Sequence, residues 1–233
     1  MAEIPDEVRN RLALVLDVDD LVEATRLARE LQPWFGVVKV GLELFSAAGP
    51  DAVVALADLD FKVFVDLKLC DIPTTVGRAA RVLGGLGASY LTMHAFGGPV
   101  MLRAGADGLA EGAAGADLPP PTALAVTILT SDDGAPPHVL GSRVRNAMEG
   151  RCGGIVCAAA DVGEAKRLGP RLIAAVPGIR LPGADADDQA RAATPEVAVA
   201  NGADLLVIGR TVTRADDRAA AAAAVAAAIT VPA

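Results

Sequence analysis

The chain alternates short apolar runs with longer amphipathic segments. Eight runs have the length and apolar character of buried strands: Leu12–Asp17, Val37–Val40, Phe61–Asp66, Tyr90–His94, Ala123–Leu129, Gly154–Cys157, Leu172–Val176 and Leu205–Ile208. The segments between them include three of helical character: Asp20–Leu31, Thr74–Leu86 and Thr194–Ala200. We expect Asp19 to cap the first of these, and Pro195 to lie in the first turn of the penultimate helix. Ala219–Ala228 is predicted to be helical from its alanine content.

Strands that alternate with helices predict βαβ units and a parallel sheet. Eight such repeats in 233 residues favour an α/β fold of the (β/α)8 TIM-barrel type over an open sheet. No linker is long enough to separate two domains, so residues 1–233 are expected to form a single barrel domain. Gly112–Pro121 and Gly178–Asp188 are predicted to be loops of that barrel.

Composition restricts the core and the partners. Hydrophobic residues make up 52% of the chain and aromatic residues only 3%, so the core must consist of Ala, Val, Leu and Ile. A net charge of −8 argues against nucleic acid as a partner, although a local basic pocket could still bind a small anion. The three cysteines fit no zinc pattern and favour a reducing, cytoplasmic location. Neither a signal peptide nor a membrane-spanning segment is expected.

Polar residues follow most of the predicted strands. The active sites of such barrels lie at the carboxyl ends of the strands. Five of the runs end in, or are soon followed by, side chains suited to catalysis or binding: Asp17, Lys39, Asp66 with Lys68, His94 and Thr130. The last two runs are followed by the short motifs Pro177-Gly178-Ile179-Arg180 and Gly209-Arg210. The pattern therefore predicts a ring of functional groups around one mouth of the barrel.

The densest group of charges follows the third run. In an extended chain Asp66 and Lys68 would point to the same side, and Asp71 follows three residues later. Such a group could be a solvated turn with an incidental ion pair. Its position after a strongly apolar strand and before a helix start favours a functional site instead.

The segment from Asp66 to Thr75 resembles the D-x-K-x-x-D-I-P-x-T signature of orotidine 5'-phosphate decarboxylases. Further matches to that family follow in its order: Leu16-Asp17, Lys39-Val40-Gly41, Leu129-Thr130-Ser131, Pro177-Gly178-Ile179-Arg180, Asp188-Gln189-x-Arg191, Thr194-Pro195 and Val207-Ile208-Gly209-Arg210. The resemblance covers roughly residues 12–215 and is greatest to the compact bacterial branch. It implies decarboxylation of orotidine 5'-monophosphate to uridine 5'-monophosphate, the last step of de novo pyrimidine nucleotide synthesis, without cofactor or metal.

The resemblance also implies a role for each matching residue. Lys68 would stabilise the carbanion at C6 and protonate it, and Asp66, Asp71 and Lys39 would complete an alternating array of lysines and aspartates. The substrate contacts that it implies are Asp17 and Thr75 to the ribose, Thr130 to the pyrimidine, Arg180, Gln189, Gly209 and Arg210 to the phosphate, and Pro177 and Ile72 beside the ligand. The family forms homodimers with shared active sites, in which Asp71 and Ile72 enter the neighbouring subunit's site.

Two other functions would explain parts of this pattern. Magnesium-dependent hexulose-phosphate synthases and ketogulonate-phosphate decarboxylases resemble the D-x-K-x-x-D segment, but they carry an acidic metal ligand at the position of Lys39. A non-catalytic nucleotide-binding barrel would be expected to lose part of the lysine–aspartate array, and this chain has all four residues. His94 is expected to have a structural role.

Overall fold

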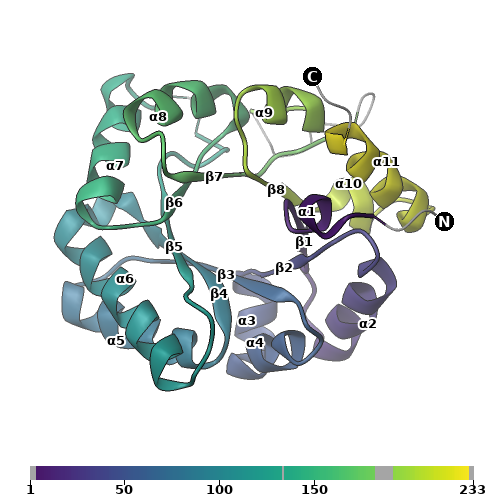
Figure 1. The fold of residues 1–233 in the computed structure, drawn as a ribbon, viewed down its shortest axis with the longest axis horizontal. Helices are drawn as coiled ribbons and strands as arrows, with labels where there is room; N and C mark the ends of the chain where they lie inside the picture. Colours follow the sequence, from purple (N-terminus) through teal and green to yellow (C-terminus); the bar gives the residue numbers. More distant parts are fainter. Residues whose placement is uncertain (1–3, 133, 182–190, 231–233) are drawn as a thin grey trace.

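The strands of the computed structural model, which describes residues 4–132, 134–181 and 191–230, close into a parallel barrel in sequence order (Figure 1). The strands are β1 Leu12–Val15, β2 Val37–Val40, β3 Lys62–Leu69, β4 Ala88–His94, β5 Thr122–Val126, β6 Gly154–Val156, β7 Ile173–Val176 and β8 Leu205–Ile208. The (β/α)8 barrel expected from the sequence is confirmed.

Helices surround the barrel on its outside, and the short α1 lies beside the start of β1 (Figure 1). They are α1 Asp6–Arg9, α2 Leu21–Leu31, α3 Leu42–Ala48, α4 Pro50–Ala57, α5 Pro73–Gly85, α6 Gly98–Gly115, α7 His138–Glu149, α8 Val162–Leu168, α9 Pro195–Ala200, α10 Arg210–Thr213 and α11 Arg218–Thr230, with 3-10 turns η1 Ala95–Gly97 and η2 Ala159–Asp161. None of the helices in the described part of the chain has the length and apolarity needed to span a membrane.

Several boundaries differ from the sequence predictions. Asp20, not Asp19, caps α2, because its side chain accepts a hydrogen bond of 2.7 Å from the Glu23 N–H. Helix α6 continues to Gly115, so the first part of the predicted Gly112–Pro121 loop is helical. Pro195 does begin α9, but α10 and α11 both follow, so α9 is not the penultimate helix. The apolar runs mark strand positions well and strand ends less well, because apolar side chains continue into the loops at the mouth.

The core has two layers. Residues on the outer face of the strands pack against the helices, and a smaller cluster fills the barrel interior: Ala13, Val15, Val37, Phe64, Leu124, Ala175, Leu205 and Val207. Phe64 also packs against the ring of Tyr90, with ring centroids 5.9 Å apart. Small aliphatic side chains dominate both layers, as the composition predicts.

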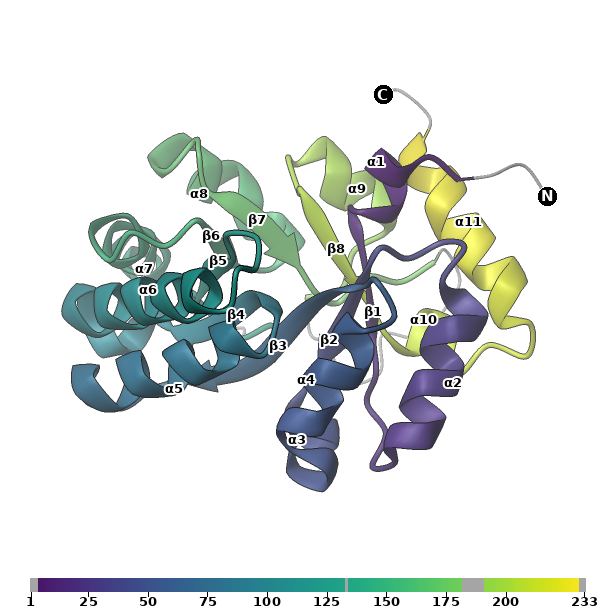
Figure 2. The same cartoon turned by 60° about the horizontal axis from the view of Figure 1, so that its bottom comes forward.

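Helices α5 and α6 lie side by side in both views (Figures 1 and 2). Glycines allow their backbones to approach closely. A Cβ atom on Gly112 would lie 1.9 Å from the carbonyl oxygen of Arg81, a distance that no real contact reaches. The helix pair behind β3 and β4 therefore depends on the absence of a side chain at this position.

Candidate active site

A cavity of about 500 Å³ opens at the carboxyl ends of the strands. Polar groups from β2, β3 and α3 and from the segments after β1, β5, β7 and β8 surround it, and apolar side chains of the barrel interior form its floor. The polar lining residues are Asp17, Lys39, Glu43, Asp66, Lys68, Thr130, Arg180, Arg210, Thr213 and Arg214. The cavity lies where the sequence predicted the functional mouth.

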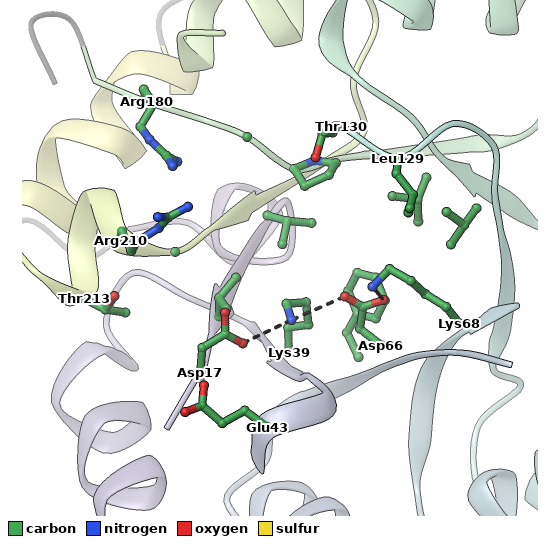
Figure 3. A pocket seen from close by; sticks show the side chains of 18 of the residues that line it. Asp17, Lys39, Glu43, Asp66, Lys68, Leu129, Thr130, Arg180, Arg210 and Thr213 are labelled. Carbon is green, nitrogen blue, oxygen red and sulfur yellow. Dashed lines mark hydrogen bonds and ion pairs between the residues drawn. The ribbon is translucent and has the colours of Figure 1, made fainter. Parts of the chain in front are cut away.

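Lys39, Asp66 and Lys68 form a continuous chain of ion pairs across one side of the cavity (Figure 3). The Lys39 Nζ atom lies 3.3 Å from Asp66 Oδ2, and the Lys68 Nζ atom lies 2.8 Å from Asp66 Oδ1. Lys39 also pairs with Asp17 Oδ1 at 3.5 Å. Since the Lys39 side chain is only 10% exposed, these carboxylates replace the water that its charge has lost.

Asp66 is the central acceptor of this chain. Burial alone would raise the pKa of its carboxyl group, but the charges of Lys39 and Lys68 and hydrogen bonds from Lys68 and Thr92 outweigh burial and lower the pKa below its ordinary value. Asp66 is therefore ionised at neutral pH. Its negative charge pairs with two ammonium groups at the wall of the cavity.

The backbone between Asp66 and Lys68 is not the regular extended strand expected from the sequence. Lys68 has a φ of 51°, in the left-handed region that residues other than glycine seldom adopt. The ladder between β3 and β4 also shifts register between Val65 and Leu69. The two side chains do meet, as expected, but they meet across an irregular bend in the chain.

The opposite side of the cavity is cationic. Arg180, at the segment after β7, is 8% exposed, and its Nη1 atom donates to the Ile179 carbonyl at 3.0 Å. Arg210 begins α10, and Figure 3 shows its guanidinium group facing that of Arg180. The Thr211 hydroxyl donates to the same Ile179 carbonyl at 2.9 Å, which ties the segments after β7 and β8 together. Two converging arginines form a site suited to a phosphate group.

Several predicted site residues lie elsewhere or are not described. Asp71, Ile72 and Thr75 are exposed and do not line the cavity of their own chain. The Asp71 carboxylate accepts a hydrogen bond of 2.6 Å from the Ile72 N–H. Pro177 and Gly209 do line the cavity, whereas Gln189 lies outside the described residues.

His94 ends β4 but does not line the cavity. Its Nδ1 atom accepts a hydrogen bond of 3.2 Å from the Phe96 N–H, so the neutral ring carries its proton on Nε2. Burial, and then the charges of Arg143 and Lys68, lower the pKa of the His94 side chain. These contacts agree with a structural role.

The structure adds residues that the sequence patterns did not single out. Glu43, in the first turn of α3, and Thr213 and Arg214, at the end of α10, line the cavity. Arg214 lies four residues after Arg210, so helical spacing could have suggested it. Thr92 contacts Asp66 and Lys68 from β4, and no local motif indicates that role.

A (β/α)8 barrel whose mouth combines a buried lysine–aspartate chain with a pair of arginines defines an enzyme class that acts on small phosphorylated substrates. Within residues 4–132, 134–181 and 191–230, no group of three or more His, Cys, Asp or Glu residues is arranged to hold a metal ion. A family model described as orotidine 5'-phosphate decarboxylase / HUMPS family matches residues 10–225, and the chain belongs to this family.

Individual relatives agree with the family assignment. The chain is 44% identical over 228 residues to an orotidine 5'-phosphate decarboxylase of Anaeromyxobacter sp. (strain K), covering 93% of this chain and 97% of the relative. It is 41% identical over 233 residues to that of Moorella thermoacetica, covering 95% and 92%. The crystal structure of the Lactobacillus acidophilus orotidine 5'-phosphate decarboxylase superposes with a TM-score of 0.80 at 31% identity, covering 95% of this chain and all of the other. The resemblance found in the sequence is thereby confirmed.

Proposed function

We propose that this chain decarboxylates orotidine 5'-monophosphate to uridine 5'-monophosphate, with Lys68 as the group that stabilises and then protonates C6. The Lys39–Asp66–Lys68 chain of ion pairs, in the same cavity as Arg180 and Arg210, is the observation that carries the proposal. The family and the named relatives support the same reaction.

The reaction needs strong fixed electrostatics. When the bond between C6 and the carboxylate carbon breaks, its electron pair stays on C6 in the plane of the ring and cannot delocalise into a carbonyl group. The Lys68 ammonium stabilises that pair and donates a proton from Nζ to C6, so CO2 leaves and uridine 5'-monophosphate forms. Asp66 holds the Lys68 ammonium in position through the 2.8 Å contact, and Lys39 extends the charged array.

Binding energy comes from the rest of the nucleotide. Arg180 and Arg210 would bind the 5'-phosphate with charge-assisted hydrogen bonds, together with Gln189 and the backbone at Gly209. Asp17, which lies beside Lys39, is suited to accept hydrogen bonds from ribose hydroxyls. Thr130 and Pro177 line the part of the cavity available to the pyrimidine. Contacts remote from C6 can thus hold the reacting ring against Lys68.

We further propose a homodimer in which Asp71, Ile72 and Thr75 complete the neighbouring subunit's site. All three are exposed and lie outside the cavity of their own chain. Large apolar side chains are also exposed in the segments that follow the neighbouring strands β3 and β4: Ile72 at 66%, Phe96 at 70% and Val100, in the first turn of α6, at 72%. A patch of this kind favours burial against a second copy.

A cytoplasmic location fits this proposal. Cys70, Cys152 and Cys157 are all free thiols, and burial raises the pKa values of both Cys152 and Cys157 to about 12. Free thiols are typical of a reducing compartment. The proposed substrate is an intermediate of nucleotide synthesis, which places its use in the same compartment.

The activity is tested by following the orotate absorbance after addition of orotidine 5'-monophosphate with EDTA present. We expect turnover that EDTA does not reduce, and a loss of at least about 10³-fold in kcat for Lys68→Ala. Turnover that EDTA abolishes would favour the magnesium enzymes of the barrel group, in which an acidic ligand stands where this chain has Lys39. Tight nucleotide binding without turnover would favour a binding protein.

The shared site is tested by mixing two inactive variants. Lys68→Ala and Asp71→Ala should each be nearly inactive as homodimers. After exchange at equal concentrations, half of the dimers are mixed and each holds one intact site, so about one quarter of the wild-type activity should return. If mass spectrometry shows that subunits exchange but activity stays at baseline, the placement of Asp71 in the partner's site is wrong.

A further inference from the structure

The ladder between β3 and β4 changes register at the catalytic residues. Val65 pairs with Leu91 and Leu69 pairs with Met93, so three residues of β3 lie opposite a single residue of β4. The three are Asp66, Leu67 and Lys68, and the single residue is Thr92. A regular ladder would place one residue against one, so the bend that carries the two charged side chains needs support from another source.

The Thr92 side chain provides this support. It is fully buried, and its Oγ1 atom accepts a hydrogen bond of 2.9 Å from the Lys68 N–H. The same hydroxyl donates to Asp66 Oδ1 at 3.0 Å. The direction of both bonds is fixed by chemistry, because an amide N–H can only donate and an ionised carboxylate can only accept.

These bonds close a ring with the ion pair. Asp66 Oδ1 accepts from both the Thr92 hydroxyl and the Lys68 Nζ atom, while the Lys68 backbone donates to the same hydroxyl. The main chain of Lys68 is therefore fixed to Thr92, and its side chain is fixed to Asp66, which Thr92 also holds. This ring also stabilises the left-handed backbone at Lys68, whose φ is 51°.

We propose that Thr92 is a positioning residue for the decarboxylation, which holds the Asp66 carboxylate and the Lys68 backbone so that the ammonium points into the cavity. This inference rests on the proposed function. Thr92 does not line the cavity, so it acts only through the two charged residues. Its loss should affect the chemical step more than the binding of the nucleotide, because the phosphate contacts lie on the opposite side of the site.

The test compares Thr92→Val, which removes the hydroxyl but keeps the shape, with Thr92→Ser, which keeps the hydroxyl. Thr127→Val is a matched control, because Thr127 is also buried, and its hydroxyl donates to the Val156 carbonyl at 2.9 Å without contacting Asp66. We expect kcat to fall about 10- to 100-fold in Thr92→Val, with the Kd for uridine 5'-monophosphate unchanged within about threefold. Thr92→Ser and Thr127→Val should keep kcat within about threefold of the wild type.

The pH profile gives a second measurement that a purely structural role would not change. Without the Thr92 hydroxyl the Asp66 carboxylate loses a donor, so the acid limb of kcat should move to higher pH in Thr92→Val and stay in place in Thr127→Val. If Thr92→Val does not fold, Thr92→Cys gives the same comparison, since its thiol is a far weaker hydrogen-bonding group.

These experiments distinguish a failure of the role of Thr92 from a failure of the proposed decarboxylase activity. Wild-type kcat and an unmoved acid limb in Thr92→Val, beside an active wild-type chain, would overturn the role of Thr92 alone. An equal fall of kcat in Thr127→Val would also overturn it, because the effect would then follow from any lost buried hydroxyl. A wild-type chain without decarboxylase activity would overturn the proposed function, and this inference with it.

Discussion

Gly41 connects β2 to α3, and replacing it with alanine tests how closely Lys39 must be positioned. A Cβ atom at this residue would lie 2.8 Å from the Lys39 Nζ atom and 3.0 Å from Asp17 Oδ1. Ordinary contacts begin at 3.4 Å, so the ammonium must move by at least about 0.6 Å. That movement is large compared with the tolerance of a site in which Lys39 Nζ lies 3.3 Å from Asp66.

The fold should tolerate this change even though the site does not. Gly41 has φ −89° and ψ −175°, a conformation open to any residue, and the atoms that it would meet are the ends of two side chains. The loss of a glycine cap from α3 should cost less than about 1 kcal/mol. Activity should nevertheless fall about 10- to 100-fold in kcat/KM, because misplacing a charged group by part of an ångström weakens its interaction with the transition state.

The assay pairs decarboxylation kinetics with urea unfolding for Gly41→Ala and a control variant, Gly163→Ala. Gly163 is an exposed residue of α8, and a Cβ there meets nothing within 4 Å, so its replacement should leave both activity and stability almost unchanged. A folded Gly41→Ala variant with kcat/KM within twofold of the wild type would refute the reasoning. Lys39 would then be able to shift without loss, and its position could not be part of the electrostatic design.

Three further predictions concern pH, packing and substrate charge. Because the pKa of His94 is lowered in the fold, the unfolded chain binds its proton more readily, so the free energy of unfolding should decrease as pH falls below 6.5. Urea titrations at pH 7.5 and 5.5 measure this decrease in the free energy of unfolding. It should be smaller in His94→Gln than in the wild type, and unchanged in His138→Gln, because His138 is exposed. Gly112→Ala should lower the free energy of unfolding by about 1–3 kcal/mol or more, because its Cβ would meet the Arg81 carbonyl. Gly115→Ala, in the same helix with open space around it, should not, and an equal loss in both would contradict the packing argument. Arg210→Ala should reduce kcat/KM about 10- to 100-fold for orotidine 5'-monophosphate and far less for the nucleoside orotidine, and an equal reduction for both would place Arg210 away from the phosphate.

The fold follows from the sequence because most strand residues are buried, and β1, β2 and β8 are buried throughout. Buried parallel strands appear as continuous apolar runs, and each run from Val37–Val40 to Leu205–Ile208 marks a strand of the barrel. The ends of the strands are harder to predict from the sequence. A polar residue at the mouth of the barrel ends an apolar run even where the backbone remains hydrogen-bonded to the next strand. The third strand continues to Leu69, beyond the end of its apolar run at Asp66.

The candidate site was predictable where local motifs encode it. The order of charged residues identifies Asp17, Lys39, Asp66 and Lys68, all of which line one cavity. The role of Thr92 was not predictable, because it depends on a register shift between two strands and not on any spacing within one. Glu43 was not predictable either, because its side chain reaches the cavity only through the way in which α3 begins after Gly41.

The two lysines of the site differ in exposure and in the number of carboxylates that they contact. Lys39 is 10% exposed and contacts two carboxylates, at 3.5 Å and 3.3 Å, so its ammonium group is paired on two sides and has little contact with solvent. Lys68 is 34% exposed and contacts one carboxylate within its own chain, at 2.8 Å. A proton donor must give up its proton and recover another from solvent in each catalytic cycle, which requires access to water. Lys68 meets that requirement and Lys39 does not. In the proposed reaction Lys68 would therefore be the group that exchanges protons, and Lys39 would serve as a fixed positive charge beside Asp66.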